Sequence, residues 1–370
     1  MSKKTKPRIS VIVSAFNAEK YIRKCLKSLS GQTMKEIEVI CIDDNSTDKT
    51  YSIMEEVSRS DPRFVISKNL ENIGVSKTRN KGIELAQADL VMFCDADDYY
   101  EETMCEELYK AMQYSPKIDI GIAEIAVTYE AHRDMKYSDD YYYSLKFSGT
   151  QKIDDEVILN TDLAPTNKIF KKKILEENDI RFPENLRYED AYFCVAYFCC
   201  SNYAYYVNEK LYQYIRHENS TMSDTWSKDA ENDPAIEHLY IAFRLFDFLI
   251  KRSLIDKYNE LYWELFYSFE LFAINNSKTI ARKKQVKKEA ADFCHEHETY
   301  LTEVSPYINE KINELNSSGI KLNKVAAKKF LIKLMPTYRL QVENVQRLRG
   351  LKNNISQLNE TVDDLSRKIR

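Results

Sequence analysis

The sequence predicts an α/β protein whose first part forms a parallel sheet with helices on both faces. Three short apolar runs have the length of buried strands: 9–14, 38–42 and 90–94. Segments with apolar residues at helical spacing lie between these runs: 18–29, 47–57 and 76–86. Alternation of strands and helices along a chain is typical of a parallel sheet.

The middle of the chain predicts further helices. Helical pattern covers 101–113, and the apolar, aromatic stretch 191–200 indicates a buried helix. The polar, Tyr-rich segment 129–149 predicts a loop. Asp233 followed by Pro234 is a good helix start, and the pattern that follows is helical and rich in aromatic residues up to Asn275. Those rings could form a binding stripe, but core packing is the simpler interpretation.

The last part of the chain predicts a short coiled coil. Apolar residues alternate at three- and four-residue intervals over about three heptads: Leu348, Leu351, Ile355, Leu358, Val362, Leu365 and Ile369. Such a seam predicts a homo-oligomer. The basic amphipathic stretch 324–339 either lies on an anionic bilayer or is the solvated face of a packed helix. We therefore expect three parts: an α/β domain at 1–225, a helical region at 226–339 and a coiled coil at 340–370.

Composition excludes several classes of protein. The chain has 370 residues and a net charge of −4, so its total charge gives no reason to expect nucleic acid as a partner. Its eight cysteines contain no CxxC pair and lie mostly in apolar runs, which indicates reduced core residues in the cytoplasm. The apolar run after the charged residues 1–6 is too short for a signal peptide or a membrane span.

An acidic turn follows the third predicted strand. Asp95, Asp97 and Asp98 come directly after the run 90–94, and ligands of such sheets bind at the carboxyl ends of the strands. Two carboxylates one residue apart can hold a Mg²⁺ or Mn²⁺ ion that also binds the oxygens of a diphosphate. The alternative is an acidic loop that caps the helix at 101–113.

A second acidic turn follows the second predicted strand. Asp43 and Asp44 precede Asn45, and one of the two carboxylates could accept hydrogen bonds from a base or a sugar. Ser46 or Thr47 could cap the next helix. Capping alone leaves the two leading acids without an explanation.

Five motifs in order resemble the family-two glycosyltransferases of bacterial surface polysaccharide synthesis, such as that of capsule and lipopolysaccharide. The motifs are Val11–Asn17, Ser28–Thr33, Ile42–Asp48, Asn72–Gly74 with Arg79–Asn80, and Asp95–Asp98. They cover roughly the first hundred residues. The resemblance implies a GT-A fold, in which a Rossmann-like domain binds a nucleotide sugar and here precedes a helical region.

The resemblance also implies a donor site and a metal site. Donor-binding residues would be Ser14, Phe16, Asn17, Asp44, Arg79, Asp95 and Ala96. Ser14 and Phe16 would lie against the nucleobase, Asp44 would accept a hydrogen bond from it, and Arg79 would lie near the phosphates. Asp97 would bind the metal directly, and Asp95 would reach the ribose or the metal. The alternative for each residue is a buried Asp or Arg in an ordinary structural network.

Further candidates follow after residue 150. The family places its catalytic base at an ED pair, here Glu189 and Asp190, at the start of the predicted helix. Asp190 would deprotonate the acceptor hydroxyl and Glu189 would contact the acceptor, unless both acids only cap the helix. The segments 166–170 and 212–217 also resemble the family. His217 would be a metal ligand or a phosphate contact, or else a polar surface group.

The sequence thus predicts an inverting, metal-dependent glycosyltransferase. It would use Mn²⁺ or Mg²⁺ and transfer a sugar from a nucleotide diphosphate donor, most simply a UDP-sugar, to a lipid-linked or polysaccharide acceptor. We expect it in the cytoplasm, with a peripheral contact to the inner face of the membrane. A nucleotidyltransferase is the alternative enzyme, but no Gly-rich phosphate loop follows the first strand. A non-catalytic scaffold that binds nucleotide sugars is the other alternative.

Overall fold

The computed structural model describes residues 6–129, 146–217, 233–297 and 300. In these residues the chain forms two compact units. The first contains residues 6–129, 146–217 and 240–258, and the second contains 233–239, 259–297 and 300. Most of the loop predicted at 129–149, the basic stretch 324–339 and the coiled coil 340–370 lie outside the described residues, and the predicted domain limits stay a prediction.

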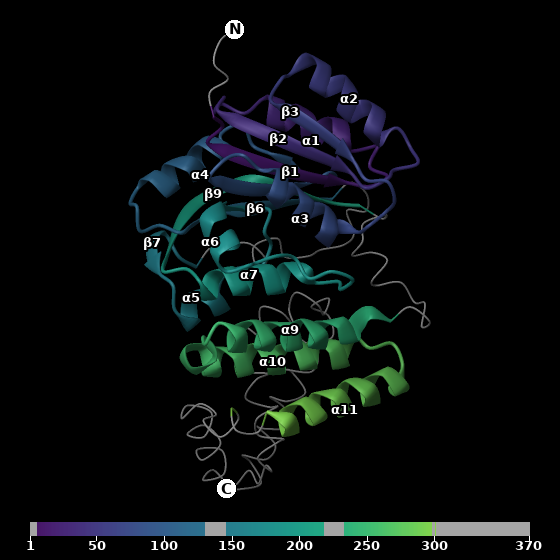
Figure 1. Ribbon diagram of the computed structural model, residues 1–370, viewed down its shortest axis with the longest axis vertical. Helices are drawn as coiled ribbons and strands as arrows, with labels where there is room; N and C mark the ends of the chain where they lie inside the picture. Colours follow the sequence, from purple (N-terminus) through teal and green to yellow (C-terminus); the bar gives the residue numbers. More distant parts are fainter. Residues whose placement is uncertain (1–5, 130–145, 218–232, 298–299, 301–370) are drawn as a thin grey trace, which may run out of the picture. The chain divides into compact units, whose positions relative to one another are not determined.

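The described strands of the first unit form one mixed sheet (Figure 1). They are β1 (Ile9–Ala15), β2 (Ile37–Asp43), β3 (Phe64–Lys68), β4 (Leu90–Asp95), β5 (Tyr99–Tyr100), β6 (Ile120–Tyr129), β7 (Gly149–Lys152), β8 (Lys168–Lys171) and β9 (Tyr203–Arg216). Their order across the sheet is β3-β2-β1-β4-β8-β6-β9-β5, and β7 pairs with β9.

The sheet is parallel in its first part and mixed in its second part, where β6 and β9 pair in parallel. The strands β1 to β4 pair in parallel, which confirms the three predicted runs. However, β8 runs antiparallel to both β4 and β6, and β5 and β7 run antiparallel to β9. The predicted parallel sheet is thus confirmed for the first part, and the mixed second part, whose strand pairs join segments far apart in the sequence, was not predicted.

The helices of the first unit up to residue 217 are α1 (Ile22–Ser30), α2 (Thr50–Ser60), α3 (Val75–Leu85), α4 (Met104–Gln113), α5 (Asp155–Leu159), α6 (Lys172–Glu177) and α7 (Glu189–Cys199). They cover both faces of the sheet, as predicted. Residues of α1, α2 and α4 share one apolar cluster with alternate strand residues. On the other face Phe93 and Phe170 pack edge to face on Phe193 of α7, which stacks on Phe182 at 3.9 Å.

The helix α3 packs unusually close to β1. A Cβ atom added at Gly82 would lie 2.3 Å from Cγ2 of Ile12, so only glycine allows this approach. The first turn of α3 follows Gly74, whose φ of 85° is a conformation that glycine adopts without strain. These two glycines fix both the start of α3 and its distance from the sheet.

The helix α9 (Glu237–Lys251) follows a short 3₁₀ turn, η1 (Pro234–Ile236). The Asp233 side chain accepts a hydrogen bond from the Ala235 amide, so Asp233 and Pro234 begin the helical region as predicted. Two more helices follow, α10 (Ile255–Asn276), which is kinked at Tyr258, and α11 (Ile280–Glu296). No helix in the described ranges is both long enough and apolar enough to cross a membrane.

Candidate active site

The candidate site lies at the carboxyl edge of the parallel strands. The strand register sets Ser14 beside both Ile42 and Asp95, so β1, β2 and β4 end together. Phe16 follows directly and is 49% exposed. An exposed ring at this edge offers a flat apolar surface on which a planar ligand group can stack.

Two loops at this edge hold each other in place. Asn17 has a φ of 48°, its amide donates to Ser46 Oγ at 2.9 Å, and its Oδ1 accepts from the Thr47 amide at 2.9 Å. The amides of Ala18 and Glu19 donate to side chains just before and at the start of α2 instead of to helical carbonyls. Next to these loop contacts, α1 begins four residues and α2 begins three residues later than the sequence predicts.

Asp44 is buried and both of its carboxylate oxygens have partners. Oδ1 accepts from Asn69 Nδ2 at 2.8 Å and from the Ile73 amide at 2.9 Å, and Oδ2 accepts from the Gly74 amide at 2.8 Å. Asp44 therefore fixes the loop that leads into α3. Contact with a nucleobase would come in addition to this structural role and stays a prediction.

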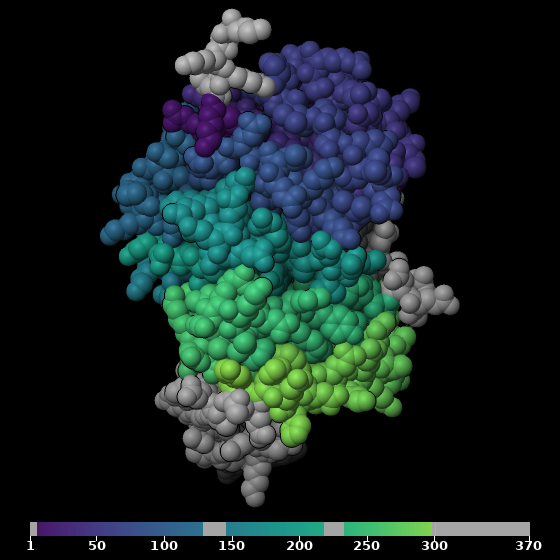
Figure 2. All heavy atoms as spheres, in the orientation of Figure 1, coloured from purple at the N-terminus to yellow at the C-terminus, as the bar shows by residue number. Residues whose placement is uncertain are grey.

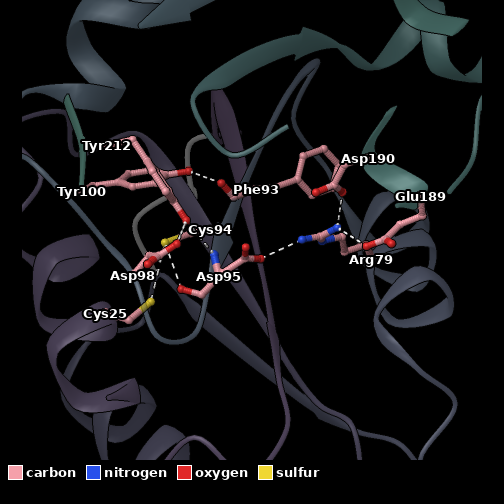
Figure 3. A network of polar contacts seen from close by, with 10 residues as sticks. All are labelled: Cys25, Arg79, Phe93, Cys94, Asp95, Asp98, Tyr100, Glu189, Asp190 and Tyr212. Atoms are coloured by element: carbon pink, nitrogen blue, oxygen red, sulfur yellow. Dashed lines mark hydrogen bonds and ion pairs between the residues drawn. The ribbon is translucent and has the colours of Figure 1, made fainter. Parts of the chain in front are cut away.

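Arg79 of α3 joins three carboxylates from two other elements (Figure 3). Its Nη1 donates to Asp190 Oδ1 at 2.6 Å and to Glu189 Oε1 at 3.0 Å, and its Nη2 donates to Asp95 Oδ1 at 2.8 Å. The Arg79 side chain is only 4% exposed, whereas that of Asp190 is 37% exposed. The arginine predicted near the phosphates thus connects the end of β4 with the start of α7.

Three carboxylates around one guanidinium leave an excess of negative charge. Burial, together with the charge of Asp190, raises the pKa of Glu189 to about 7 although Arg79 opposes the rise. Burial also raises the pKa of Asp190, and Arg79 again acts to lower it. Glu189 therefore holds a proton up to about neutral pH, and the half-exposed Asp190 is the carboxylate that can take one from a ligand.

Asp97 and His217 meet at the same edge. The Asp97 Oδ2 and His217 Nε2 atoms are 2.9 Å apart, and the Tyr21 ring stacks on the imidazole with centroids 4.3 Å apart. Two neighbouring ligand atoms of an octahedral ion, each about 2.1 Å from it, are about 3 Å apart, so this pair fits one divalent ion. Within the described ranges no three His, Cys, Asp or Glu side chains gather as a metal-binding group. The predicted third ligand, Asp95, is instead bonded to Arg79.

Asp98 is turned away from the site. It accepts hydrogen bonds from the Tyr212 hydroxyl and, at 2.7 Å, from the Ile215 amide. Burial and the nearby Asp97 and Asp95 raise its pKa well above the usual value. Hydrogen bonds from β9 therefore hold Asp98 in place, although the charges of Asp95 and Asp97 oppose its ionisation. The Ala96 side chain between them is also buried.

Two residues of the site make contacts that the sequence did not predict, although Lys168 belongs to the segment 166–170 that resembles the family. Tyr21 belongs to the apolar pattern of a helix and gave no reason to expect a ring against His217. Lys168 is fully buried, and its Nζ donates to Asp162 Oδ1 and the Ala164 carbonyl at 2.7 Å and to Asn167 Oδ1 at 2.8 Å. Its charge lowers the Asp190 pKa, opposing the effect of burial. Only the fold brings this lysine near the ED pair.

Comparison with known proteins gives three findings. The family model described as "Glycosyl transferase family 2" matches residues 10–178. The chain is 30% identical to "Putative glycosyltransferase EpsH" of Bacillus subtilis (strain 168) over 250 residues, which are 64% of this chain and 69% of EpsH. It is 30% identical over 227 residues to the poly(ribitol-phosphate) beta-N-acetylglucosaminyltransferase TarS of Staphylococcus aureus (strain Mu50), covering 59% of this chain and 37% of TarS.

The fold also resembles a solved structure. The crystal structure of S. aureus TarS 1–349 in complex with UDP-GlcNAc superposes with a TM-score of 0.55 and 21% identity, covering 77% of this chain and 92% of that one. This likeness confirms the predicted GT-A fold.

Proposed function

Because this chain belongs to glycosyl transferase family 2 and is a glycosyltransferase, we propose that it transfers a sugar from a UDP-sugar to an acceptor hydroxyl with inversion. The acceptor is a lipid-linked saccharide or a polysaccharide. The observation that carries the proposal is the arginine cluster, in which one buried guanidinium binds Asp95 at the strand end and Asp190 at the start of α7.

Asp190 is the general base in this proposal. Its carboxylate is accessible, and the ion pair with Arg79 at 2.6 Å holds it in one orientation and keeps it ionised. The Glu189 proton removes one negative charge from the cluster, which also favours ionised Asp190. The acceptor hydroxyl loses its proton to Asp190 as its oxygen attacks the anomeric carbon from the side opposite the leaving diphosphate.

The donor lies along the carboxyl edge of β1, β2 and β4. The exposed Phe16 ring stacks on the nucleobase beside Ser14 and Asn17, and Asp44 accepts a hydrogen bond from the base. The backbone at Ala96 and the Asp95 carboxylate face the sugar and ribose side of the donor. This placement follows the general rule that ligands of such sheets bind at the ends of the strands.

Asp97 and His217 would hold a Mn²⁺ or Mg²⁺ ion, and donor diphosphate oxygens and water would supply the other ligands. When bound, the ion supplies positive charge that stabilises the leaving diphosphate. The Tyr21 ring keeps the imidazole turned toward Asp97. Arg79 bears the second positive charge of the site.

The relatives support the choice of donor and acceptor. The structure of TarS with UDP-GlcNAc favours a UDP-sugar, and the name of TarS describes transfer to a polymer, poly(ribitol-phosphate). A lipid-linked acceptor would bring the enzyme to the inner face of the membrane as a peripheral protein, and the seam at 340–370 would make it a homo-oligomer.

A donor panel tests the proposal. The full chain is incubated with UDP-, GDP- and dTDP-sugars, with Mn²⁺, Mg²⁺ or EDTA, and the release of nucleoside diphosphate is measured. We expect release from a UDP-sugar that needs a divalent ion and increases with a saccharide acceptor. Pyrophosphate release from UTP and a sugar phosphate would indicate a nucleotidyltransferase instead. Binding of UDP-sugars without any release over the whole acceptor panel would indicate a scaffold.

A further inference from the structure

The helix α11 exposes one face that is both basic and apolar. Ile280, Lys284, Lys287 and Lys288 follow each other at the spacing that places side chains on one side of a helix. All four are exposed, Ile280 to 75%, whereas Val286 and Ala290 on the opposite side are buried. We call these four residues the α11 basic face, and Figure 2 shows the atoms of α11 at the surface in yellow-green.

The charge around this face has one sign. The segment 278–288 contains six Lys or Arg residues and no acidic residue, and the acids of α11 begin only at Glu289. Glu289 accepts a hydrogen bond from Gln285 Nε2 at 2.8 Å along the flank of the helix. Among the described residues no ion pair joins Lys284, Lys287 or Lys288 to a carboxylate.

This arrangement costs stability in water. Cations are unfavourable at the positive N-terminal end of a helix, where Arg282 and Lys283 lie, and α11 has no acid in its first turn to offset them. Lysines three and four residues apart also repel each other. An isoleucine that is 75% exposed loses the stabilisation that burial would give. The α11 basic face is therefore poorly suited to water alone.

We propose that the α11 basic face docks the protein on an anionic lipid bilayer. The lysines lie at the lipid phosphates, and Ile280 enters the boundary between headgroups and acyl chains. A soluble anionic polymer would neutralise the lysines but would leave Ile280 in water. A bilayer offers both phosphates for the lysines and an apolar environment for Ile280. The docking is independent of the proposed sugar transfer, since no residue of the face belongs to the candidate active site.

Vesicle sedimentation tests this proposal with the full chain. The vesicles contain either phosphatidylcholine alone or phosphatidylcholine with about a third phosphatidylglycerol. We expect binding only to the anionic vesicles, weakening with salt. The triple variant Lys284→Glu, Lys287→Glu, Lys288→Glu should bind at least about 100-fold more weakly, since each lysine near the surface contributes about fivefold.

The matched control reverses three exposed lysines elsewhere, Lys117, Lys152 and Lys210, and so has the same net charge. It should bind within about threefold of the wild type. Ile280→Ser should weaken binding roughly tenfold, because burial of several methyl and methylene groups is lost. Thermal unfolding separates docking from folding: the triple variant should keep a melting temperature close to that of the wild type, because all three side chains are exposed.

Three results would overturn the proposal. The first is wild-type vesicle binding by the triple variant. The second is an equal loss in the control, which would make net charge the cause. The third is binding that Ile280→Ser leaves unchanged and that a soluble polyphosphate displaces completely, which would make a polymer the partner. Sugar transfer to a soluble acceptor is measured in parallel and should be the same in all variants.

Discussion

Replacing Glu189 by Gln tests the charge balance around Arg79. Burial raises the pKa of Glu189 from 4.5 to about 7, and the charge of Asp190 adds to this rise. The folded state therefore favours the protonated form more than the unfolded state does. The contribution of protonated Glu189 to the free energy of unfolding is fully present below pH 4.5 and is lost as the pH rises through about 7. Glutamine stays neutral at every pH, so the variant does not lose this stability as the pH rises.

The rise in pKa sets the size of the effect. One pKa unit is worth about 1.4 kcal/mol, so the wild type should lose on the order of 2 kcal/mol of unfolding free energy between pH 5 and pH 8 through this group. Glu189→Gln should gain that amount relative to the wild type over the same range. Urea unfolding, followed by circular dichroism at several pH values, measures the difference.

The exposed Glu84 on α3 offers a matched control. The free energy of unfolding of Glu84→Gln should differ from that of the wild type by a nearly constant amount between pH 5 and pH 8. The charge balance would be refuted if the unfolding free energy of Glu189→Gln, relative to the wild type, were equally constant or fell as the pH rises. Glu189 would then be ionised throughout this range.

Three more predictions follow from single features. Asp97→Ala should abolish metal-dependent turnover and weaken Mn²⁺ binding in calorimetry while the circular dichroism spectrum is unchanged, because the Asp97 side chain is 31% exposed and lies outside the apolar core; wild-type activity in EDTA would contradict it. Gly82→Ala should lower the free energy of unfolding by about 1 to 3 kcal/mol, because its Cβ would lie 2.3 Å from Ile12 Cγ2. Gly31→Ala, where the nearest atom is 3.4 Å away, is the control, and equal effects would refute the argument. Removal of 340–370 should convert an oligomer to a smaller species in light scattering, and a monomeric full-length chain would contradict the heptads.

The strands of the parallel sheet could be predicted because each is a short buried run whose residues are nearly all apolar. β3 was missed because its apolar run, Phe64 to Ile66, has only three residues, fewer than a buried strand usually shows. The antiparallel strands were missed for another reason. β8 is four residues long and pairs with partners about 50 and 80 residues away, and no local pattern encodes such pairing.

The candidate site likewise has features that the sequence predicts and features that it does not. The position of the acids after β2 and β4 follows from the sequence, since strands end where polar residues begin. The direction in which each acid points does not. Asp98 turns toward β9, and Arg79 binds Asp190, which is 111 residues away in the chain. Such partners are set by the packing of α3 and α7 against the sheet, which spacing along the sequence does not encode.

The most direct test of the account is the comparison of Asp190→Asn with the wild type. Asparagine keeps the shape and can still accept the hydrogen bond from Arg79, but it removes the basic carboxylate. With a UDP-sugar and a saccharide acceptor, kcat for transfer should fall by a factor on the order of a hundred or more. The dissociation constant for the UDP-sugar, measured by calorimetry, should stay within about threefold of the wild-type value. Equal losses of donor binding and transfer, or full transfer by the variant, would contradict the assignment of Asp190 as the base.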